Sequence, residues 1–214
     1  MSGAKDATIA ETYKDRLNAL RNGGGRKILG IVGPPGCGKS TLAAALLDLL
    51  GDDAVAVPMD GYHLANVELA RLGRAGRKGA EDTFDSAGYV SLLRRLKNQQ
   101  GNEIVYAPEF RREIEEPIAN AIPVFPETQL VITEGNYLLL DHGHWAGVSE
   151  LLDEIWYVDI DHSVRRERRV KRHMHFGRSQ NAAEDWVANT DEPNAVRIEA
   201  AKHRADVLFN WEGE

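Results

Sequence analysis

One glycine-rich stretch, Gly33 to Ser40, constrains the fold of this chain more than any other feature. Its sequence, GPPGCGKS, fits the pattern G-x-x-x-x-G-K-[ST], and it lies between an apolar run at 28–32 and a helical pattern that begins at Lys39. Glycines let the backbone curl so that successive N–H groups point at one phosphate, and a helix N-terminus adds a positive dipole. The stretch therefore predicts a strand, a phosphate-binding loop (P-loop) and a helix, in that order.

Individual side chains of this loop have expected roles of their own. Lys39 supplies a mobile cation for the β- and γ-phosphates of a nucleotide, and the Ser40 hydroxyl is expected to ligate Mg²⁺. Cys37 occupies a variable position where a small residue fits, and a redox role is the alternative, because helix N-termini lower the pKa of thiols. ATP and Mg²⁺ are the expected cofactors. The expected cofactor-binding residues here are Gly33, Pro34, Pro35, Gly36, Cys37, Gly38, Lys39, Ser40 and Thr41.

Short apolar runs alternate with helical patterns along the rest of the chain. Near-continuous apolar runs are typical of parallel strands buried on both faces, and they predict strands at 28–32, 54–57, 130–133, 155–158 and 206–209. The periodicity predicts helices at 39–50, 89–98, 163–175, 182–187 and 194–203. This alternation predicts an α/β fold of three layers, the P-loop NTPase architecture, with a five-stranded parallel sheet and a basic helical lid.

The first 25 residues differ from the rest of the chain. Apolar residues at helical spacing predict an amphipathic helix from Ile9 to Leu20, and the glycines at 23–25 form the only linker-like stretch. We therefore expect an N-terminal helix and glycine linker at 1–25 and one domain at 26–214. The proline-rich stretch 105–125 is expected to be a long irregular connection, and connections of that length often carry function.

Two carboxylates follow the ends of predicted strands: Asp60 comes after the run 54–59, and Glu134 comes after 130–133. In open α/β sheets, ligands bind beyond the carboxyl ends of the strands, so both acids should face the phosphates held by the P-loop. One of them can hold Mg²⁺, and the other can take a proton from an attacking hydroxyl. The alternative for either residue is a solvated acid in a turn.

Asp60 begins the tetrapeptide DGYH, and the basic stretch 69–80, which contains no acidic residue, follows it. A transferred phosphate and an anionic or polyhydroxyl acceptor both need hydrogen-bond donors, so we expect a substrate-side loop here. A basic surface loop with no role is the alternative. For His63, a substrate contact and a purely structural position are both open. The expected substrate-binding residues of this loop are Tyr62, His63 and Lys78.

The densest positive charge lies at 163–178, where seven Lys and Arg residues stand against the single acid Glu167, a local net charge of +6. A basic helix after the fourth strand of such a sheet can close over a nucleotide and stabilise charge on the transferring phosphoryl group. We therefore expect a lid at about 163–180. The alternative is a solvated helix face or a site for an acidic partner.

Overall charge and cysteine content limit the partners and the compartment. The chain has 26 Lys and Arg against 33 Asp and Glu, a net charge of −7, which argues against nucleic acid as a partner. A single cysteine suits a reducing compartment, and we expect the cytoplasm. No apolar run approaches the roughly 18 residues that cross a bilayer, so no membrane partner is expected. A homodimer is an assembly that the sequence leaves open.

Several segments together resemble one family. They are GPPGCGKST, DGYH, KGAEDTFD, YAPEFRR, EGNYLLL, the lid segment RRERRVKRH, and GRSQNAAEDWV followed by DEPNA. The chain resembles the P-loop kinases of the uridine kinase, phosphoribulokinase and bacterial pantothenate kinase group over about residues 27–209. Within that group it is most similar to bacterial fructose transport system kinases and nucleoside-kinase-like proteins. Arg111 stands where an aspartate is common in such proteins, and Glu81 stands where many carry proline.

The resemblance implies a role for each matching residue. Asp60 matches the catalytic base, and Glu134 matches the acid that organises Mg²⁺ together with Ser40. Arg112 falls near the acceptor. The resemblance implies Asp60, Lys39 and Arg169 as catalytic residues. It implies Arg165 and Arg172 as nucleotide-binding lid residues, and Asp60, Tyr62, His63, Lys78, Arg112 and Glu134 as substrate-binding residues.

These observations predict a Mg·ATP-dependent kinase that moves the γ-phosphoryl group to a hydroxyl of a small metabolite. The resemblance favours a sugar such as fructose. A nucleoside or pantothenate-type acceptor is one alternative. An ATPase switch that acts on a protein partner is an alternative of another class.

Overall fold

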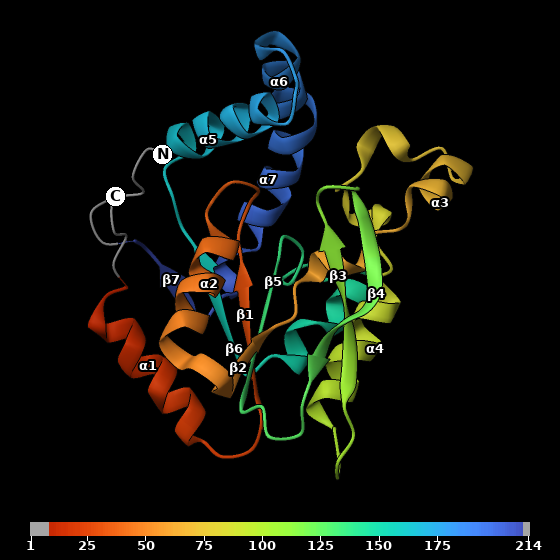
Figure 1. Ribbon diagram of the computed structural model, residues 1–214. Coiled ribbons are helices and arrows are strands. Elements are labelled where there is room, and N and C mark those ends of the chain that lie inside the picture. The colour runs from red at the N-terminus through yellow and green to blue at the C-terminus, as the bar shows by residue number, and fades with distance from the viewer. Residues whose placement is uncertain (1–8, 212–214) are drawn as a thin grey trace.

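A five-stranded parallel sheet forms the middle layer of the molecule (Figure 1), described by a computed structural model for residues 9–211. Its strands lie in the order β2-β5-β1-β6-β7. Strand β1 pairs with β5 from Lys27 opposite Leu130 to Val32 opposite Gly135. The strands are β1 Lys27–Val32, β2 Ala54–Ala56, β5 Leu130–Gly135, β6 Glu154–Val158 and β7 Val207–Phe209. The prediction of five parallel strands is confirmed.

Helices cover both faces of this sheet, and the alternation of side chains along each strand explains how. In β1, Ile28 and Val32 point to one core and Leu29 and Ile31 to the other, because successive strand residues face opposite sides. Helices α1 and α2 cover one face, and α4 covers the other (Figure 1). The helices are α1 Glu11–Asn22, α2 Lys39–Leu50, α3 Asn66–Arg71, α4 Ser86–Lys97, α5 His162–His175, α6 Gln180–Trp186 and α7 Glu192–Ala200. Helix α3 was not expected.

Helix α1 packs on the β7 edge of the sheet. Leu17 is buried, and the Tyr13 ring centre lies 4.6 Å from that of Phe209. The Tyr13 hydroxyl donates to the Leu208 carbonyl at 3.1 Å. The glycines at 23–25 form the turn between α1 and β1. The division of the chain at residue 25 stays a prediction.

The proline-rich stretch 105–125 contradicts the expectation of an irregular connection, because most of it forms an antiparallel hairpin of β3 Val105–Arg111 and β4 Glu116–Val124. Proline lacks an N–H donor and is therefore confined to strand edges and bulges. Pro108 lies at the point where the pairing register shifts, between Ala107 and Glu109. Apolar side chains of the hairpin, including Val105, join the core under α4. The proline-rich stretch is therefore a two-stranded ribbon and not an irregular loop.

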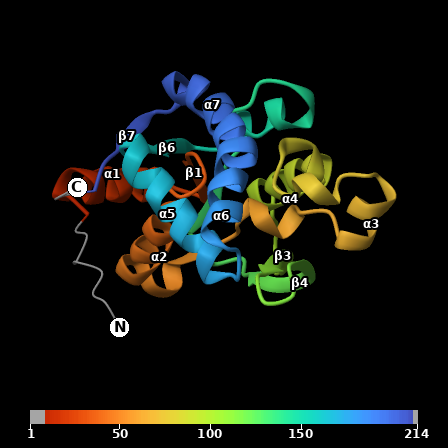
Figure 2. The same ribbon diagram turned by 90° about the horizontal axis from the view of Figure 1, so that it is seen from above.

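The lid segment rises above the carboxyl end of the sheet through α5 and α6, and α7 returns to the sheet (Figures 1 and 2). Asp161 caps α5 by accepting from the Ser163 backbone N–H at 2.8 Å. The sequence predicts separate helices at 182–187 and 194–203. The structure instead joins α6 to α7 through a π-helical turn, Val187–Asp191. Among residues 9–211, no helix is long and apolar enough to span a membrane.

A buried pair of hydroxyl hydrogen bonds fixes the segment that leads from β2 to Asp60. The Thr133 hydroxyl donates to the Val57 carbonyl at 2.7 Å, and the Tyr89 hydroxyl lies 2.6 Å from the same Thr133 oxygen. Because the Thr133 proton is used on Val57, Tyr89 is the donor in the second bond. Burial raises the pKa of Tyr89, which keeps its hydroxyl protonated. This connection ties α4, β5 and the end of β2 together.

Replacing Thr133 by valine is therefore expected to lower the free energy of unfolding by about 1–3 kcal/mol, because two buried polar groups lose their partner. Denaturant titration of T133V against S91A measures the effect. Ser91 is an exposed hydroxyl on α4 that donates to the Ala87 carbonyl of its own helix. An unfolding midpoint for T133V equal to that of S91A would contradict the role given to this connection.

Candidate active site at the phosphate-binding loop

The P-loop joins β1 to α2, as the sequence predicts. Gly36 and Gly38 have φ angles of 88° and 97°, a left-handed conformation that glycine adopts without strain. Lys39 is the first residue of α2, and only 8% of it is exposed. Its ammonium donates to the carbonyls of Gly33 at 2.9 Å and Pro34 at 3.2 Å. The loop therefore holds a cation against its own backbone, beside the N-terminus of α2.

Cys37 is fully buried in this loop, and burial raises the pKa of its thiol. A redox role needs an accessible thiolate. The structure thus removes the physical basis of the redox alternative, and Cys37 packs in the core below α2.

Glu134 lies directly beside the P-loop. It is the fifth residue of β5, whereas the sequence predicts that it follows the strand, and 6% of it is exposed. The Ser40 hydroxyl donates to its Oε1 at 2.9 Å. Burial raises the pKa of Glu134, and the nearby Asp60 carboxylate raises it further. Lys39 and Ser40 lower the same pKa, but their effect is smaller. A hydroxyl and a carboxylate in contact form the kind of oxygen donor set that Mg²⁺ takes, so these two residues fit the expected metal.

Asp60 lies across from this pair, in a short 3₁₀ turn, Met59–Tyr62, that follows β2. Its side chain is 30% exposed, and Oδ2 lies 3.9 Å from Nη2 of Arg112 at the end of the β3-β4 hairpin. Since β2 and β5 are adjacent parallel strands, their ends bring Asp60 and Glu134 to the same edge of the sheet. The structure therefore brings together the two carboxylates and the arginine that the sequence singled out.

The turn that carries Asp60 packs tightly against the β3-β4 hairpin. The Gly61 backbone packs against the Pro108 carbonyl so closely that a β-carbon at Gly61 would collide with it. A glycine is thus required in the DGYH tetrapeptide for steric reasons. The stretch that the sequence predicts as an irregular loop supplies the wall against which Asp60 is positioned.

His63 lies between two aromatic rings. Its ring centre is 4.0 Å from that of Phe84 and 4.6 Å from that of Phe110, and Nδ1 donates to the Asp60 carbonyl at 2.8 Å. Burial lowers the pKa of His63, which favours the neutral ring. The ring therefore holds the backbone of Asp60 in place, while Nε2 is the nitrogen not used in that contact.

Tyr62 and Lys78 lie near Asp60 and His63 and contact other aromatic residues. Tyr62 packs on Tyr89 at 5.5 Å between ring centres, and burial raises the pKa of Tyr62 to about 12. Lys78 lies 5.2 Å from the centre of the Phe110 ring and donates to Asn66 Oδ1 at 2.6 Å and to the Glu115 carbonyl. Lys78 thus contacts the tip of the hairpin, and it shares Phe110 with His63.

Helix α5 brings two of the three predicted arginines next to the P-loop, Arg169 through its side chain and Arg165 through its backbone. A β-carbon on Gly36 would lie 2.8 Å from both Cγ and Cδ of Arg169 and 3.3 Å from the Arg165 carbonyl oxygen. Arg165 is 1% exposed and donates to Glu192 at 2.8 Å. Arg172 is exposed on α5. Helix α5 therefore lies directly over the loop.

The acidic partners of these arginines are residues that the sequence pattern did not predict. Asp191 accepts from Arg169, and Glu192 accepts from Arg165. Both acids belong to the DEPNA motif, for which the sequence suggested no chemistry. The excess of basic over acidic residues at 163–178 was the available signal, because acidic partners of most of these arginines can come only from another segment.

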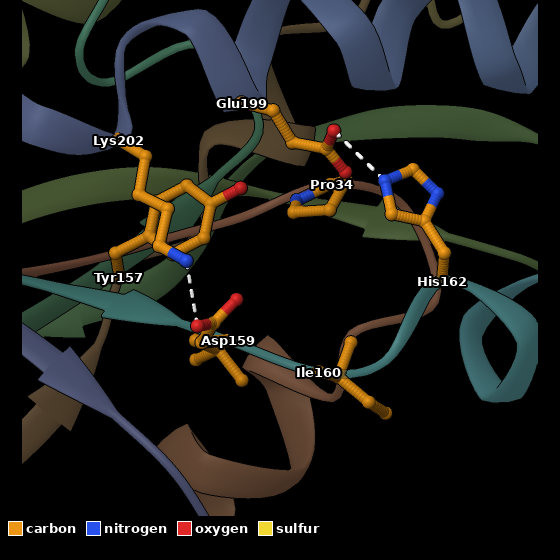
Figure 3. Close-up of a pocket in the computed structure, with 8 residues that line it drawn as sticks. Pro34, Tyr157, Asp159, Ile160, His162, Glu199 and Lys202 are labelled. Atoms are coloured by element: carbon orange, nitrogen blue, oxygen red, sulfur yellow. Dashed lines mark hydrogen bonds and ion pairs between the residues drawn. The ribbon is translucent and has the colours of Figure 1, made fainter.

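A cavity of about 160 Å³ lies at the base of the lid, where the P-loop, the end of β6 and the end of α7 meet (Figure 3). Lys202 donates to Asp159 at 2.6 Å, and His162 lies 3.0 Å from Glu199. Pro34 forms the P-loop side of the cavity. The Lys202–Asp159 ion pair and the His162–Glu199 contact join the start of α5 and the segment before it to the end of α7 and the residues after it, so the cavity lies between the start of α5 and the end of α7.

Comparison with known proteins gives a family. The sequence model of the Phosphoribulokinase / Uridine kinase family matches residues 28–212. The chain belongs to this family. The chain is therefore an ATP-dependent phosphotransferase that acts on a hydroxyl acceptor, and the expected resemblance and fold are confirmed.

Individual relatives agree with this assignment. A Schizosaccharomyces pombe protein, named as a candidate uridine kinase, is 34% identical over 204 residues, which cover 91% of this chain and 86% of that protein. A crystal structure from Silicibacter sp. TM1040, described as a candidate fructose transport system kinase, is 37% identical with a TM-score of 0.84 and covers 94% of this chain and 98% of that one. YFH7 from Saccharomyces cerevisiae shares the fold at 19% identity and a TM-score of 0.81, with 94% and 98% of the chains covered.

Proposed function

We propose that this kinase transfers the γ-phosphoryl group of ATP to a hydroxyl of a sugar of the fructose type. The observation that carries the proposal is the placement of Asp60 and Arg112 opposite the Lys39 and Ser40–Glu134 cluster at one edge of the sheet. The similarity to the Silicibacter structure over nearly the whole chain supports a sugar acceptor. The cytoplasm is the compartment we propose, since the single cysteine is buried as a thiol.

The nucleotide side of the site is built from the P-loop. The loop amides and Lys39 hold the phosphates of ATP, because they place donors and a cation at the N-terminus of α2. Ser40 and Glu134 are the residues that would hold Mg²⁺. The metal, when bound, neutralises charge on the phosphate oxygens. Arg169 lies above Gly36, where its guanidinium can stabilise charge on the transferring group.

The acceptor side is built from the DGYH turn and the hairpin. Asp60 takes the proton of the acceptor hydroxyl as the oxygen forms its bond to the γ-phosphorus, and the bond between that phosphorus and the ADP oxygen breaks. Arg112 lies beside Asp60 and donates to the acceptor or to the group in transfer. His63 and Lys78 shape this side of the site through their contacts with Phe110, and Tyr62 shapes it through its contact with Tyr89.

A nucleoside acceptor is the second candidate, and one observation favours it. The Schizosaccharomyces pombe relative that covers 91% of this chain is named for uridine. Sugars and nucleosides both offer a primary hydroxyl to the catalytic base Asp60. A nucleoside also carries a nucleobase ring, which an aromatic side chain such as Phe110 can contact.

The test is ADP release by the purified protein with Mg²⁺ and ATP over a panel of acceptors, with each product identified by mass. The panel contains sugars, nucleosides, pantothenate and ribulose phosphate. We expect ADP release that depends on a sugar, with a product heavier by one phosphoryl group. Transfer to a nucleoside alone would replace the sugar assignment, and ATP hydrolysis that no acceptor stimulates would favour an ATPase switch acting on a protein partner.

A further inference from the structure

The π-helical turn Val187–Asp191 is the feature of the lid that the sequence pattern does not predict. Such turns interrupt the regular hydrogen bonding of a helix and are frequent at functional sites. This turn ends at Asp191, whose side chain is only 7% exposed. A carboxylate taken out of water in this way needs charged partners, and the turn aims it at α5.

Two groups of α5 meet this carboxylate. Arg169 donates through Nε to Oδ2 at 2.8 Å and through Nη2 to Oδ1 at 2.9 Å. His173, one helical turn further along, places Nε2 at 3.0 Å from Oδ2. A two-point contact between a planar guanidinium and a planar carboxylate fixes the plane of both groups. Asp191 therefore sets the orientation of the Arg169 head group.

The stem of Arg169 is fixed independently of its head. Its Cγ and Cδ lie so close to Gly36 that no side chain larger than hydrogen fits at that position. The side chain thus has its stem against the P-loop and its guanidinium held by Asp191. Nε and Nη2 are used in the pair, and Nη1 is the nitrogen that neither Asp191 nor His173 engages.

We propose that Asp191 is a positioning residue that orients Arg169 above the phosphate-binding loop, so that the Nη1 side of the guanidinium meets the phosphoryl group in transfer. The proposal rests on the proposed function. Because α6 and α7 deliver Asp191 while α5 delivers Arg169, the pair also joins the two arms of the lid. A misplacement of about 1 Å in a catalytic group can cost about 10²-fold in rate, so the orientation matters for turnover.

The neighbouring Arg165–Glu192 pair is held less completely than the Arg169–Asp191 pair. Glu192 contacts Arg165 through a single hydrogen bond, from Nη2 to Oε2 at 2.8 Å, and Arg165 Nε and Nη1 and Glu192 Oε1 are buried without hydrogen-bond partners among the described residues. In the Asp191 pair, both carboxylate oxygens are used. The Asp191 pair is thus the one whose geometry is fully determined by the fold.

The test measures binding of ADP with aluminium fluoride, which imitates the phosphoryl group in transfer, to the full chain with Mg²⁺. For D191N we expect affinity for this probe to fall about 10- to 100-fold, with affinity for ADP alone nearly unchanged, because only the probe fills the γ position. In an R169Q background, D191N is expected to have no further effect, since Asp191 acts through Arg169. The matched control is E167Q, which removes an exposed carboxylate that binds Lys171 on the same helix.

Equal affinity of D191N and E167Q for ADP with aluminium fluoride would overturn the proposal, as would an undiminished effect of D191N in the R169Q background. A lower melting temperature alone, with the affinity ratio intact, would also overturn it, because it would show a structural role. Should D191N not fold, D191E keeps the charge and moves the carboxylate by one methylene, and a smaller loss of probe affinity is expected. This binding assay needs no acceptor, so its failure is separate from failure of the acceptor panel.

Discussion

Replacing Asp60 by asparagine is expected to lower kcat by about 10²- to 10⁴-fold, the contribution of a positioned general base. The amide keeps the size of the side chain but cannot take the acceptor proton. ATP affinity should stay nearly unchanged, because Lys39 and the P-loop belong to different elements from the turn that carries Asp60. Steady-state kinetics with the acceptor found in the panel, together with equilibrium binding of ATP, separate the two effects.

The control for D60N is E68Q, which removes a carboxylate from α3 that pairs with Arg71 at the surface. E68Q should keep the turnover of the unaltered protein. If D60N turned over at a rate close to that of E68Q, Asp60 would not be the base, and the proton would have to leave by another route.

Replacing Lys39 by methionine is expected to have the second large effect. Methionine fills the buried space along the stem but removes the charge that the Gly33 and Pro34 carbonyls hold. We expect kcat to fall by about 10²- to 10³-fold, as when one preorganised donor to a developing charge is lost, and ATP binding to weaken. The same kinetic and binding measurements check both results.

K14M is the matched control for K39M, because Lys14 is a lysine on α1 whose partner is the exposed Glu11. Arginine is not expected to replace Lys39, since a planar guanidinium does not fit a point-charge site that is 8% exposed. Unchanged turnover and ATP affinity in K39M would remove the lysine from the phosphate site.

The parts of the fold that the sequence predicts are those with local patterns. The spacing of glycines, lysine and serine at 33–40 fixes the P-loop, and continuous apolar runs fix the five strands. The shared edge of Asp60 and Glu134 then follows from the rule that parallel strands end together. The position of Glu134 inside its strand was not predicted, because a charged residue in a buried run looks like the end of that run.

The parts that the sequence did not predict depend on contacts between distant segments. The hairpin at 105–124 contains prolines that look like loop residues until the partner strand is known. Asp191 lies 22 residues from Arg169, and nothing in the local spacing links them. A π-helical turn has no clear sequence pattern of its own. The pairing of Arg169 with Asp191 was therefore not predicted from the sequence.

The most direct measurement traces the γ-phosphorus of ATP. The protein is incubated with Mg²⁺, the acceptor panel and ATP labelled at the γ-phosphate, and the labelled products are separated and weighed. We predict that the label enters an organic phosphate ester in the unaltered protein and that the transfer is strongly reduced in D60N. Label recovered only as inorganic phosphate, at equal rates with and without acceptors, would contradict phosphoryl transfer to a small metabolite.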